Sequence, residues 1–501
     1  MSFNFTDVKA DDAAVLGLVV YMLNGADVTG TVSGTTLGGS SFSNSGDQGV
    51  YLRADNDAVA TNSITFFQTA MNDNTNVGLY IDSLNGSQFT ANFNTGTINN
   101  NGIDNIFTNV DGGSTLTLNV DPSDLSGAVT GSGFEFDVNN GSSLFANLDA
   151  VTITGSGFQG INGFVNNGST ATLTVNNSNI TQSQEYGVLI QAQNGSTATT
   201  NITGTVIGSN NQSLVGFGGI GIFADNSTTN LNMFQTDVTN SSGTQFLGLW
   251  SRTLNGGTFN GDIDTTNFFD NIGDGARVEV HGAGSLANVD FISTGAIGNS
   301  GNGVNLIADT GATLQASVSG TSAFSANTGN GLLLTATGGT TIAQVTGSGA
   351  STFDNSLNGA GVRIDATAVA QIVANIAGGA SNNATNGMEF NITNQTASGA
   401  DLSVNGSFND MSRNGNNGVL FNITGSNVAR ASASNLFAEG NGQNGILYSI
   451  TNSTLNNVSG SPISVSNTFL QSNGQSGLSF ALTDVNGADS TTSASAATHW
   501  T

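Results

Sequence analysis

The residues best suited to acid–base chemistry lie close together between positions 262 and 281. This group contains four aspartates, a glutamate, an arginine and a histidine: Asp262, Asp264, Asp270, Asp274, Arg277, Glu279 and His281. Cleavage of a glycosidic bond needs two carboxyl groups about 5 to 9.5 Å apart, one acting as acid and the other as nucleophile or base. The group therefore raises polysaccharide cleavage as one hypothesis. The competing interpretation is a ladder of ion pairs beside a solvated turn.

Aromatic residues at outward positions form a second candidate site. Flat rings on an exposed face can stack on sugars, and edge-to-face packing of the same rings is the structural alternative. The carbohydrate-binding hypothesis rests on Tyr51, Tyr80, Phe223, Trp250 and Arg277.

Calcium is the one cofactor that the acidic residues suggest. Asp111 and Asp274 stand in predicted turns, where carboxylates can bind Ca²⁺. The sequence contains neither an EF-hand loop nor the Gly-Gly-x-Gly-x-Asp nonapeptide. We expect no other cofactor and no catalytic residue set.

The elements that position these residues recur about every 28 residues. Each repeat begins at an anchor residue, usually glycine, followed by apolar residues at alternate positions, as in Val50/Leu52 and Val304/Leu306. The anchors are Gly17, Gly49, Gly78, Asn105, Gly133, Gly163, Gly187, Gly221, Gly248, Gly275, Gly303, Gly331, Gly361, Gly387, Gly418, Gly445 and Gly477. Alternation with a period of two predicts strands with one buried face, and a repeat of this length predicts stacked turns.

Each repeat holds two further short elements. A second alternating strand follows the first, as in residues 115–120, and a third element carries a phenylalanine at Phe42, Phe268, Phe324, Phe353, Phe408, Phe437 or Phe469. Three strands and roughly 28 residues per turn are too few for a propeller blade. We therefore predict an all-β chain that forms a single right-handed parallel β-helix of about 17 turns.

Stacking successive turns places certain outward residues side by side. The predicted neighbours are Arg53 with Asp82, Arg363 with Glu389, and Tyr51 with Tyr80, together with the columns Asp225/Arg252/Glu279 and Phe223/Trp250/Arg277. Opposite charges and paired rings on adjacent strands stabilise a sheet by roughly 0.2–1 kcal/mol per pair. This register assigns Glu279 to an ion-pair ladder and favours the structural interpretation of the acidic group.

In its repeats the chain resembles the right-handed parallel β-helix superfamily, the pectate-lyase-like group that includes bacterial surface proteins and phage tailspikes. The resemblance covers roughly residues 15 to 485. His281-Gly282 is similar to the His-Gly of the polygalacturonase family, and Arg363-Ile364 to its Arg-Ile-Lys, with Asp365 in place of the lysine. The resemblance implies a β-helix and, for that family, polysaccharide cleavage.

Composition limits the partners and the compartment. The 501 residues include one lysine and six arginines against 34 acids, for a formal charge of −27, so the basic surface that nucleic acids require is absent. No apolar run is long enough to span a membrane. Abundant Gly, Asn, Ser and Thr, with no Cys, favour an extracellular or cell-surface location.

These observations predict one solenoid domain over residues 1–485 and a tail, or the start of a further segment, over 486–501. We expect a structural or adhesive extracellular protein, a rod segment of a surface or fibre-forming assembly, without enzymatic activity. Its expected partners are neighbouring repeats of a longer chain or other copies joined end to end, with a polysaccharide as a further candidate partner. The alternatives are a polysaccharide-binding or polysaccharide-cleaving β-helix enzyme and a trimeric phage tailspike.

Overall fold

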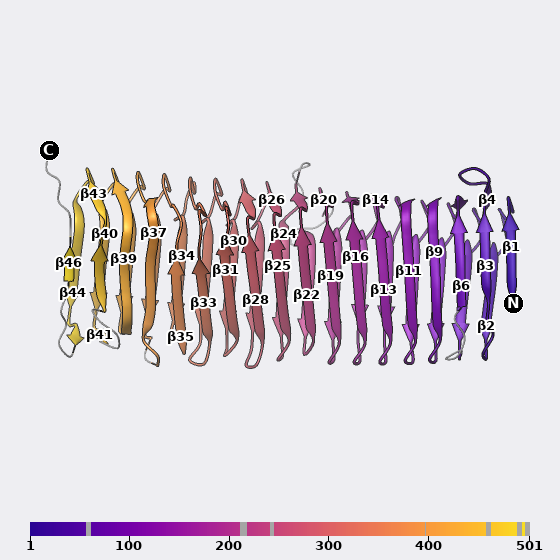
Figure 1. The fold of residues 1–501 in the computed structure, drawn as a ribbon, viewed down its shortest axis with the longest axis horizontal. Helices are drawn as coiled ribbons and strands as arrows, with labels where there is room; N and C mark the ends of the chain where they lie inside the picture. Colours follow the sequence, from indigo (N-terminus) through magenta and orange to yellow (C-terminus); the bar gives the residue numbers. More distant parts are fainter. Residues whose placement is uncertain are drawn as a thin grey trace. The chain divides into compact units, whose positions relative to one another are not determined.

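The computed structural model describes residues 1–56, 62–210, 218–240, 245–395, 397–456, 462–487 and 493–495. Every regular element among them is a β-strand (Figure 1). The chain forms a parallel β-solenoid, as the 28-residue repeat predicted, with about 16 turns where the repeat count predicted about 17. It divides into two compact units, Met1–Phe246 and Leu247–Thr501.

In each unit the strands that follow the anchor residues form one parallel sheet, called sheet B here. In the first unit it contains β2 (Leu18–Leu23), β5 (Val50–Asp55), β8 (Leu79–Leu84), β10 (Ile106–Asp111), β12 (Phe134–Val138), β15 (Ile161–Val165), β18 (Val188–Gln193) and β21 (Gly218–Asp225). In the second unit it contains β24 (Leu247–Leu254), β27 (Ala276–His281), β30 (Val304–Asp309), β32 (Leu332–Thr337), β34 (Val362–Thr367), β36 (Met388–Thr393), β38 (Val419–Thr424), β40 (Asn444–Thr451) and β44 (Ser476–Thr483).

The second and third strands of the turns form sheet A. In the first unit these strands are β1 (Ser2–Thr6), β3 (Thr29–Ser33), β4 (Ser40–Ser41), β6 (Asn62–Phe67), β7 (Thr69–Ala70), β9 (Gln88–Thr97), β11 (Thr115–Asp124), β13 (Ser143–Asp149), β14 (Thr152–Thr154), β16 (Thr170–Asn176), β17 (Asn179–Thr181), β19 (Thr197–Thr203), β20 (Val206–Gly208), β22 (Thr228–Phe234) and β23 (Asp237–Thr239). In turns such as β9 and β11 the second and third strands merge into one of 10 residues.

In the second unit sheet A contains β25 (Thr258–Asp264), β26 (Asn267–Phe269), β28 (Leu286–Ile292), β29 (Gly295–Ile297), β31 (Thr313–Ser319), β33 (Ile342–Gly347), β35 (Gln371–Ile376), β37 (Ala400–Asp410), β39 (Asn427–Glu439), β41 (Thr454–Leu455), β42 (Ile463–Ser466), β43 (Phe469–Gln471), β45 (Asn486–Gly487) and β46 (Ser493–Ser495). β45 and β46 lie within the predicted tail and pair in parallel with β41 and β42.

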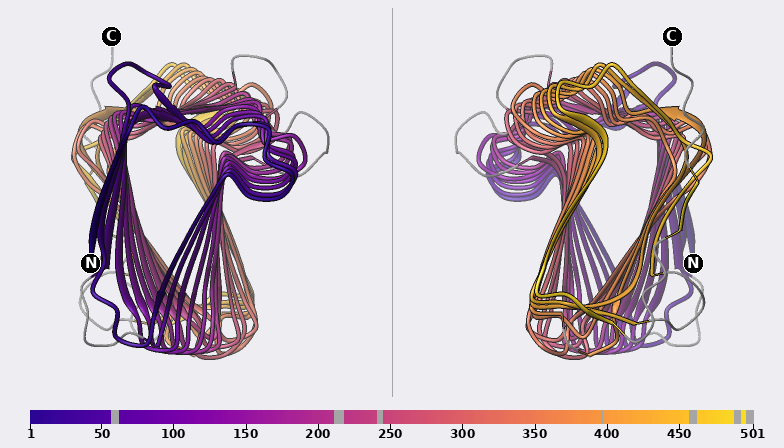
Figure 2. Two further views of the ribbon diagram at one scale, coloured as in Figure 1. Left: turned by 90° about the vertical axis from the view of Figure 1, so that its right-hand side faces the viewer. Right: turned by 90° about the vertical axis from the view of Figure 1, so that its left-hand side faces the viewer.

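The core is built from the inward residues of both sheets. Within each unit the turns repeat one outline when viewed along the stack (Figure 2). Equivalent side chains meet one turn apart: the rings of Phe390, Phe421 and Tyr448 stack with centroid separations of 5.0 and 4.8 Å. Such stacking explains why phenylalanine dominates the aromatic residues, because flat rings fill a repeating interior without voids.

The predicted internal phenylalanines are confirmed in part. Phe42, Phe268, Phe324 and Phe353 are buried, but Phe437 is half-buried and Phe469 is 39% exposed, and these last two stack on each other outside the core. At that position in β39 the inward residues are Leu436 and Ala438. The side chain of Phe408 lies outside the described residues.

Two predicted anchors are wrong. Ile161 is the register partner of Phe134, and Ile220 that of Val188, so the residues before these strands are Gly160 and Gly219 rather than Gly163 and Gly221. Gly163 instead lies inside β15 and faces the core. The ring of Phe136 occupies the space that a side chain at Gly163 would need.

Among the residues that the structure describes, no helix has the length and apolar character needed for a membrane crossing.

Candidate functional site

Aromatic rings line the outer face of sheet B in the first unit. Tyr21, Tyr51, Tyr80 and Phe107 come from four successive strands, β2, β5, β8 and β10, and each ring contacts the next, forming an aromatic ladder. The centroid separations are 5.9, 5.2 and 5.0 Å. The first two contacts are edge-to-face, the geometry that aromatic pairs prefer. Tyr21 is 56% exposed, and the other three rings are partly exposed.

Sequence reasoning identified Tyr51 and Tyr80 but missed the two ends of this ladder. Phe107 is the register partner of Tyr80, and the regular spacing of the turns was enough to find it. Tyr21 was harder to identify, because its register partner is Arg53 and its ring leans across to Tyr51.

A small hydrogen-bond network holds the Tyr51 ring of the ladder in position. The Tyr51 hydroxyl donates a 2.5 Å hydrogen bond to Oδ2 of Asp82, and Asn109 donates to Oδ1 of the same carboxylate. Burial and then the Asp82 carboxylate raise the pKa of Tyr51 above its ordinary value. Burial, with the charges of Asp82 and Asp137, raises the pKa of Tyr80 to about 12. Both rings therefore remain neutral at physiological pH.

Arg53 is the register partner of Asp82, as the sequence predicted, but it binds a different acid. Its Nη2 lies 2.6 Å from Asp55, two residues along the same strand. Arg363 likewise lies 2.9 Å from Asp365 on its own strand and 3.9 Å from its register partner Glu389. Residues two apart on a strand point to the same face, which makes this shorter pairing possible.

The predicted columns in the second unit are in register but differ in their contacts. Trp250 pairs with Arg277, and Arg252 with Glu279. Glu279 lies 2.5 Å from Arg277 on its own strand and 3.9 Å from Arg252. Phe223 and Asp225 belong to the first unit, where they pair with Gln191 and Gln193. Their predicted pairing with residues of the second unit stays a prediction.

The acidic group that suggested glycosidic cleavage is dispersed. Asp262 and Asp264 lie on β25 of sheet A, Asp270 and Asp274 lie in the turn before β27, and Glu279 and His281 lie on β27. His281 contacts Glu279 at 3.5 Å and Asp309 at 3.0 Å. Burial acts to raise the pKa of Asp309, but hydrogen bonds from Thr310 and His281 outweigh it and lower the value.

Both predicted calcium ligands accept hydrogen bonds from neighbouring residues. Asp274 accepts bonds from the backbone and side-chain nitrogens of Asn302 and from Asn305. Asp111 accepts bonds from Gly112 and Asn140. Within the described ranges, no three His, Cys, Asp or Glu residues come together in a way that could hold a metal ion. Calcium binding stays a prediction.

A group of acids that the sequence analysis missed lies where the aromatic ladder ends. Glu135 on β12 is the register partner of Phe107, Asp137 lies two residues further along, and Asp104 lies just before β10. Burial and then the Glu135 carboxylate raise the pKa of Asp104 to about 7 and that of Asp137 to about 6. Shifts of this size are typical of functional sites, although structural networks also produce them.

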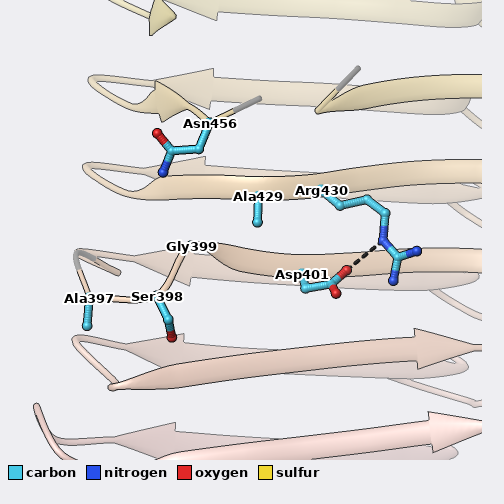
Figure 3. Close-up of a pocket in the computed structure, with 7 residues that line it drawn as sticks. All are labelled: Ala397, Ser398, Gly399, Asp401, Ala429, Arg430 and Asn456. Atoms are coloured by element: carbon cyan, nitrogen blue, oxygen red, sulfur yellow. Dashed lines mark hydrogen bonds and ion pairs between the residues drawn. The ribbon is translucent and has the colours of Figure 1, made fainter. Parts of the chain in front are cut away.

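The second unit carries a pocket of about 520 Å³ on sheet A. Small residues line much of it: Ala397, Ser398, Gly399 and Ala429, with Asp401, Arg430 and Asn456. Arg430 and Asp401 point toward each other across neighbouring strands (Figure 3), with Nε 2.6 Å from Oδ1. A second nitrogen of Arg430 donates to Asn375 at 2.7 Å. None of the residues predicted as sites from the sequence lines this pocket.

No family model matches the chain, and no curated protein matches it. Similar solved structures include that of the PL6 family alginate lyase AlyGC, at 9% identity, with 97% of each chain covered and a TM-score of 0.18. A mutant of the same enzyme matches at 8% identity, covering 99% of this chain and 96% of the other, with a TM-score of 0.16. Because both are enzymes, the expectation that this chain is not an enzyme is contradicted and is withdrawn. Likenesses this weak carry no argument about substrate or mechanism.

Proposed function

We propose that this chain is an extracellular adhesive β-solenoid that binds polysaccharide along the aromatic ladder Tyr21–Tyr51–Tyr80–Phe107. The observation that carries the proposal is the regular spacing of these partly exposed rings, one per turn, on a single face. A glycan lying along the stack would meet one ring per turn. Sugar rings have apolar C–H faces, which lose unfavourable contact with water when they cover an aromatic ring.

Hydrogen-bonding groups beside the ladder support the proposal. Arg53, Asp55 and Asn109 occupy the neighbouring outward positions, where they could reach sugar hydroxyls. The Tyr51–Asp82 bond holds one ring in place before a ligand arrives, which reduces the ordering cost of binding. Adhesion and end-to-end association with other copies or repeats stay part of the prediction.

Native electrophoresis in gels containing soluble polysaccharide tests the binding. The panel should include a neutral β-glucan, a xylan and a polyuronate, each compared with a gel that contains none. We expect at least one of them to retard the wild type, and the double variant Tyr51→Ala/Tyr80→Ala to bind it about tenfold or more weakly, since each ring contributes roughly 1 kcal/mol.

Phe145→Ala provides the matched control. Phe145 is an outward aromatic on β13 of sheet A, 45% exposed and remote from the ladder. This variant should bind like the wild type. Equal retardation of the ladder variant and the wild type would contradict the proposal, as would a lack of retardation by every polysaccharide in the panel.

Cleavage of the bound polysaccharide is a second candidate function. Glu135 and Asp137 follow the ladder on β12, and the raised pKa of Asp137 is a property expected of a carboxylic acid that donates a proton near neutral pH. Release of new chain ends from each polysaccharide should be measured for the wild type, Glu135→Gln and Asp137→Asn. Wild-type release that both variants lose would support cleavage, and its absence in the wild type would exclude it for the panel.

A further inference from the structure

Asp104 and Asp274 occupy the same position in two different turns. Each lies just before a strand of sheet B, β10 or β27, and each is nearly fully buried, at 5% and 7% exposed. Oδ1 of each accepts a 2.7 Å hydrogen bond from a backbone N–H one turn later, from Ser132 for Asp104 and from Asn302 for Asp274. The two aspartates are therefore equivalent residues of the repeat.

The two turns differ in the residue that faces the second carboxylate oxygen. Oδ2 of Asp274 accepts a 2.8 Å hydrogen bond from the side-chain amide of Asn305, and Asn302 adds a side-chain donor to Oδ1. Asn305 is the second residue of β30, and its equivalent on β12 is Glu135. Asp104 thus faces an acid where Asp274 faces an amide donor. In the part of the chain that the structure describes, the Ser132 N–H is the hydrogen-bond donor to Asp104.

The charges that act on Asp104 are all negative. They belong to Glu135 and Asp137, both on β12, and the charge of Glu135 also acts on Asp137. Glu135 accepts hydrogen bonds from Ser132 and Asn162, both neutral. Arg53, the cation on the same face, is paired with Asp55. A buried carboxyl such as that of Asp104, beside a half-buried one such as that of Glu135, favours a state in which the buried group is protonated and donates a hydrogen bond to its neighbour.

We propose that the carboxyls of Asp104 and Asp137, beside the carboxylate of Glu135, form a pH switch at the end of the aromatic ladder, holding protons in mildly acidic solution and releasing them as the solution becomes alkaline. In the protonated state the O–H of Asp104 donates a hydrogen bond to Glu135. This bond takes the place of the one that Asn305 donates to Asp274 in the equivalent turn. In the deprotonated state the three carboxylates repel one another beside Phe107. The switch would regulate the proposed saccharide-binding face, and only this regulatory role rests on the proposed function.

The direction of the effect on stability follows from the raised pKa values. An ordinary aspartate in the unfolded chain titrates near 3.8, whereas folding raises the pKa of Asp104 to about 7 and that of Asp137 to about 6. The folded state therefore binds more protons than the unfolded state over this interval. The contribution of the switch is fully present below the unfolded pKa and is lost as the pH rises through about 6 to 7.

Urea unfolding of the full chain at about pH 5 and about pH 8 tests the switch without a ligand. We expect the wild-type midpoint to be lower at the higher pH. The variant Glu135→Asn copies the Asp274–Asn305 arrangement and should lose most of this difference. If the urea midpoint of Glu135→Asn differs between the two pH values as much as that of the wild type, the proposal is overturned.

The reverse substitution keeps the test informative if Glu135→Asn fails to fold. Asn305→Glu places an acid opposite Asp274 and should introduce a new fall in the midpoint between the same two pH values. A variant that shows no added pH dependence would also contradict the proposal.

Polysaccharide binding measured at both pH values separates this inference from the proposed function. Binding that is absent at both values, with the unfolding difference intact, would reject the proposed function and leave the switch standing. If binding persists while Glu135→Asn and the wild type show the same difference in urea midpoint between the two pH values, the switch is rejected.

Discussion

The hydroxyl of Tyr51 donates a 2.5 Å hydrogen bond to the carboxylate of Asp82 in the next turn. This bond decides how the neighbouring charges pair. Asp82 is nearly buried and already accepts bonds from Tyr51 and Asn109, and Arg53 pairs with Asp55 on its own strand instead. A hydrogen bond from a tyrosine thus replaces the ion pair that the register alone would predict.

Removing this hydroxyl should destabilise the first unit while leaving the ring in place. Hydrogen bonds to charged groups contribute about 1.5–3 kcal/mol, so we expect Tyr51→Phe to lower the free energy of unfolding by about 1.5 kcal/mol. Urea unfolding followed by circular dichroism measures the change. Tyr21→Phe is the control, since Tyr21 is 56% exposed, and it should change the value by less than about 0.5 kcal/mol. Equal effects of the two substitutions would contradict a structural role for the Tyr51–Asp82 bond.

The inward glycine of β15 should tolerate no side chain while the neighbouring ring is present. A Cβ at Gly163 would overlap the ring of Phe136, its register partner, so Gly163→Val should destabilise the fold by about 1–3 kcal/mol through overpacking. Phe136→Ala alone should cost about 3–5 kcal/mol, because it leaves a cavity.

The double variant Gly163→Val/Phe136→Ala distinguishes this explanation from a general need for glycine in the strand. The new side chain would fill part of the cavity, so the double variant should be more stable than the sum of the two single changes predicts. Strict additivity in the measured free energies of unfolding would show that the ring and the glycine are independent.

A buried asparagine ladder should be a main source of stability in the second unit. Asn271, Asn299 and Asn327 lie one turn apart, and each of the first two donates a side-chain hydrogen bond to the next. Asn299→Ala would remove bonding partners from buried groups: the backbone and side-chain N–H groups of Asn271 lose an acceptor, and the Phe268 carbonyl loses a donor. Each such group costs about 1–3 kcal/mol, so we expect a loss of roughly 3 kcal/mol or more.

An exposed amide ladder provides the comparison. Asn422 donates to Asn391 at 3.0 Å on the outer face of sheet B, where water can replace the lost bond. Asn422→Ala should change the free energy of unfolding by about 0.5 kcal/mol or less. If Asn299→Ala were equally mild, the buried ladder would not stabilise the fold as proposed.

The repeat was readable from the sequence because its signal is local. Apolar residues alternate after each anchor, and this alternation alone predicted strands such as β5 and β30. Residues equivalent by spacing, such as Tyr51 and Tyr80, are register partners in the structure. The errors at Gly163 and Gly221 arose where a glycine within a strand resembled an anchor, since the sequence does not show which ring fills the space beside it.

The sequence by itself determined that this chain coils into stacked parallel turns, and it determined most of the residues that face outward together. Only the tertiary structure decided which of several nearby groups each charged residue binds, and that Asp104 faces Glu135 while its equivalent Asp274 faces Asn305. The physical reason is that strand alternation follows from the chain's own period, whereas the partner of a side chain depends on rotamer, burial and the competing donors of the turns above and below.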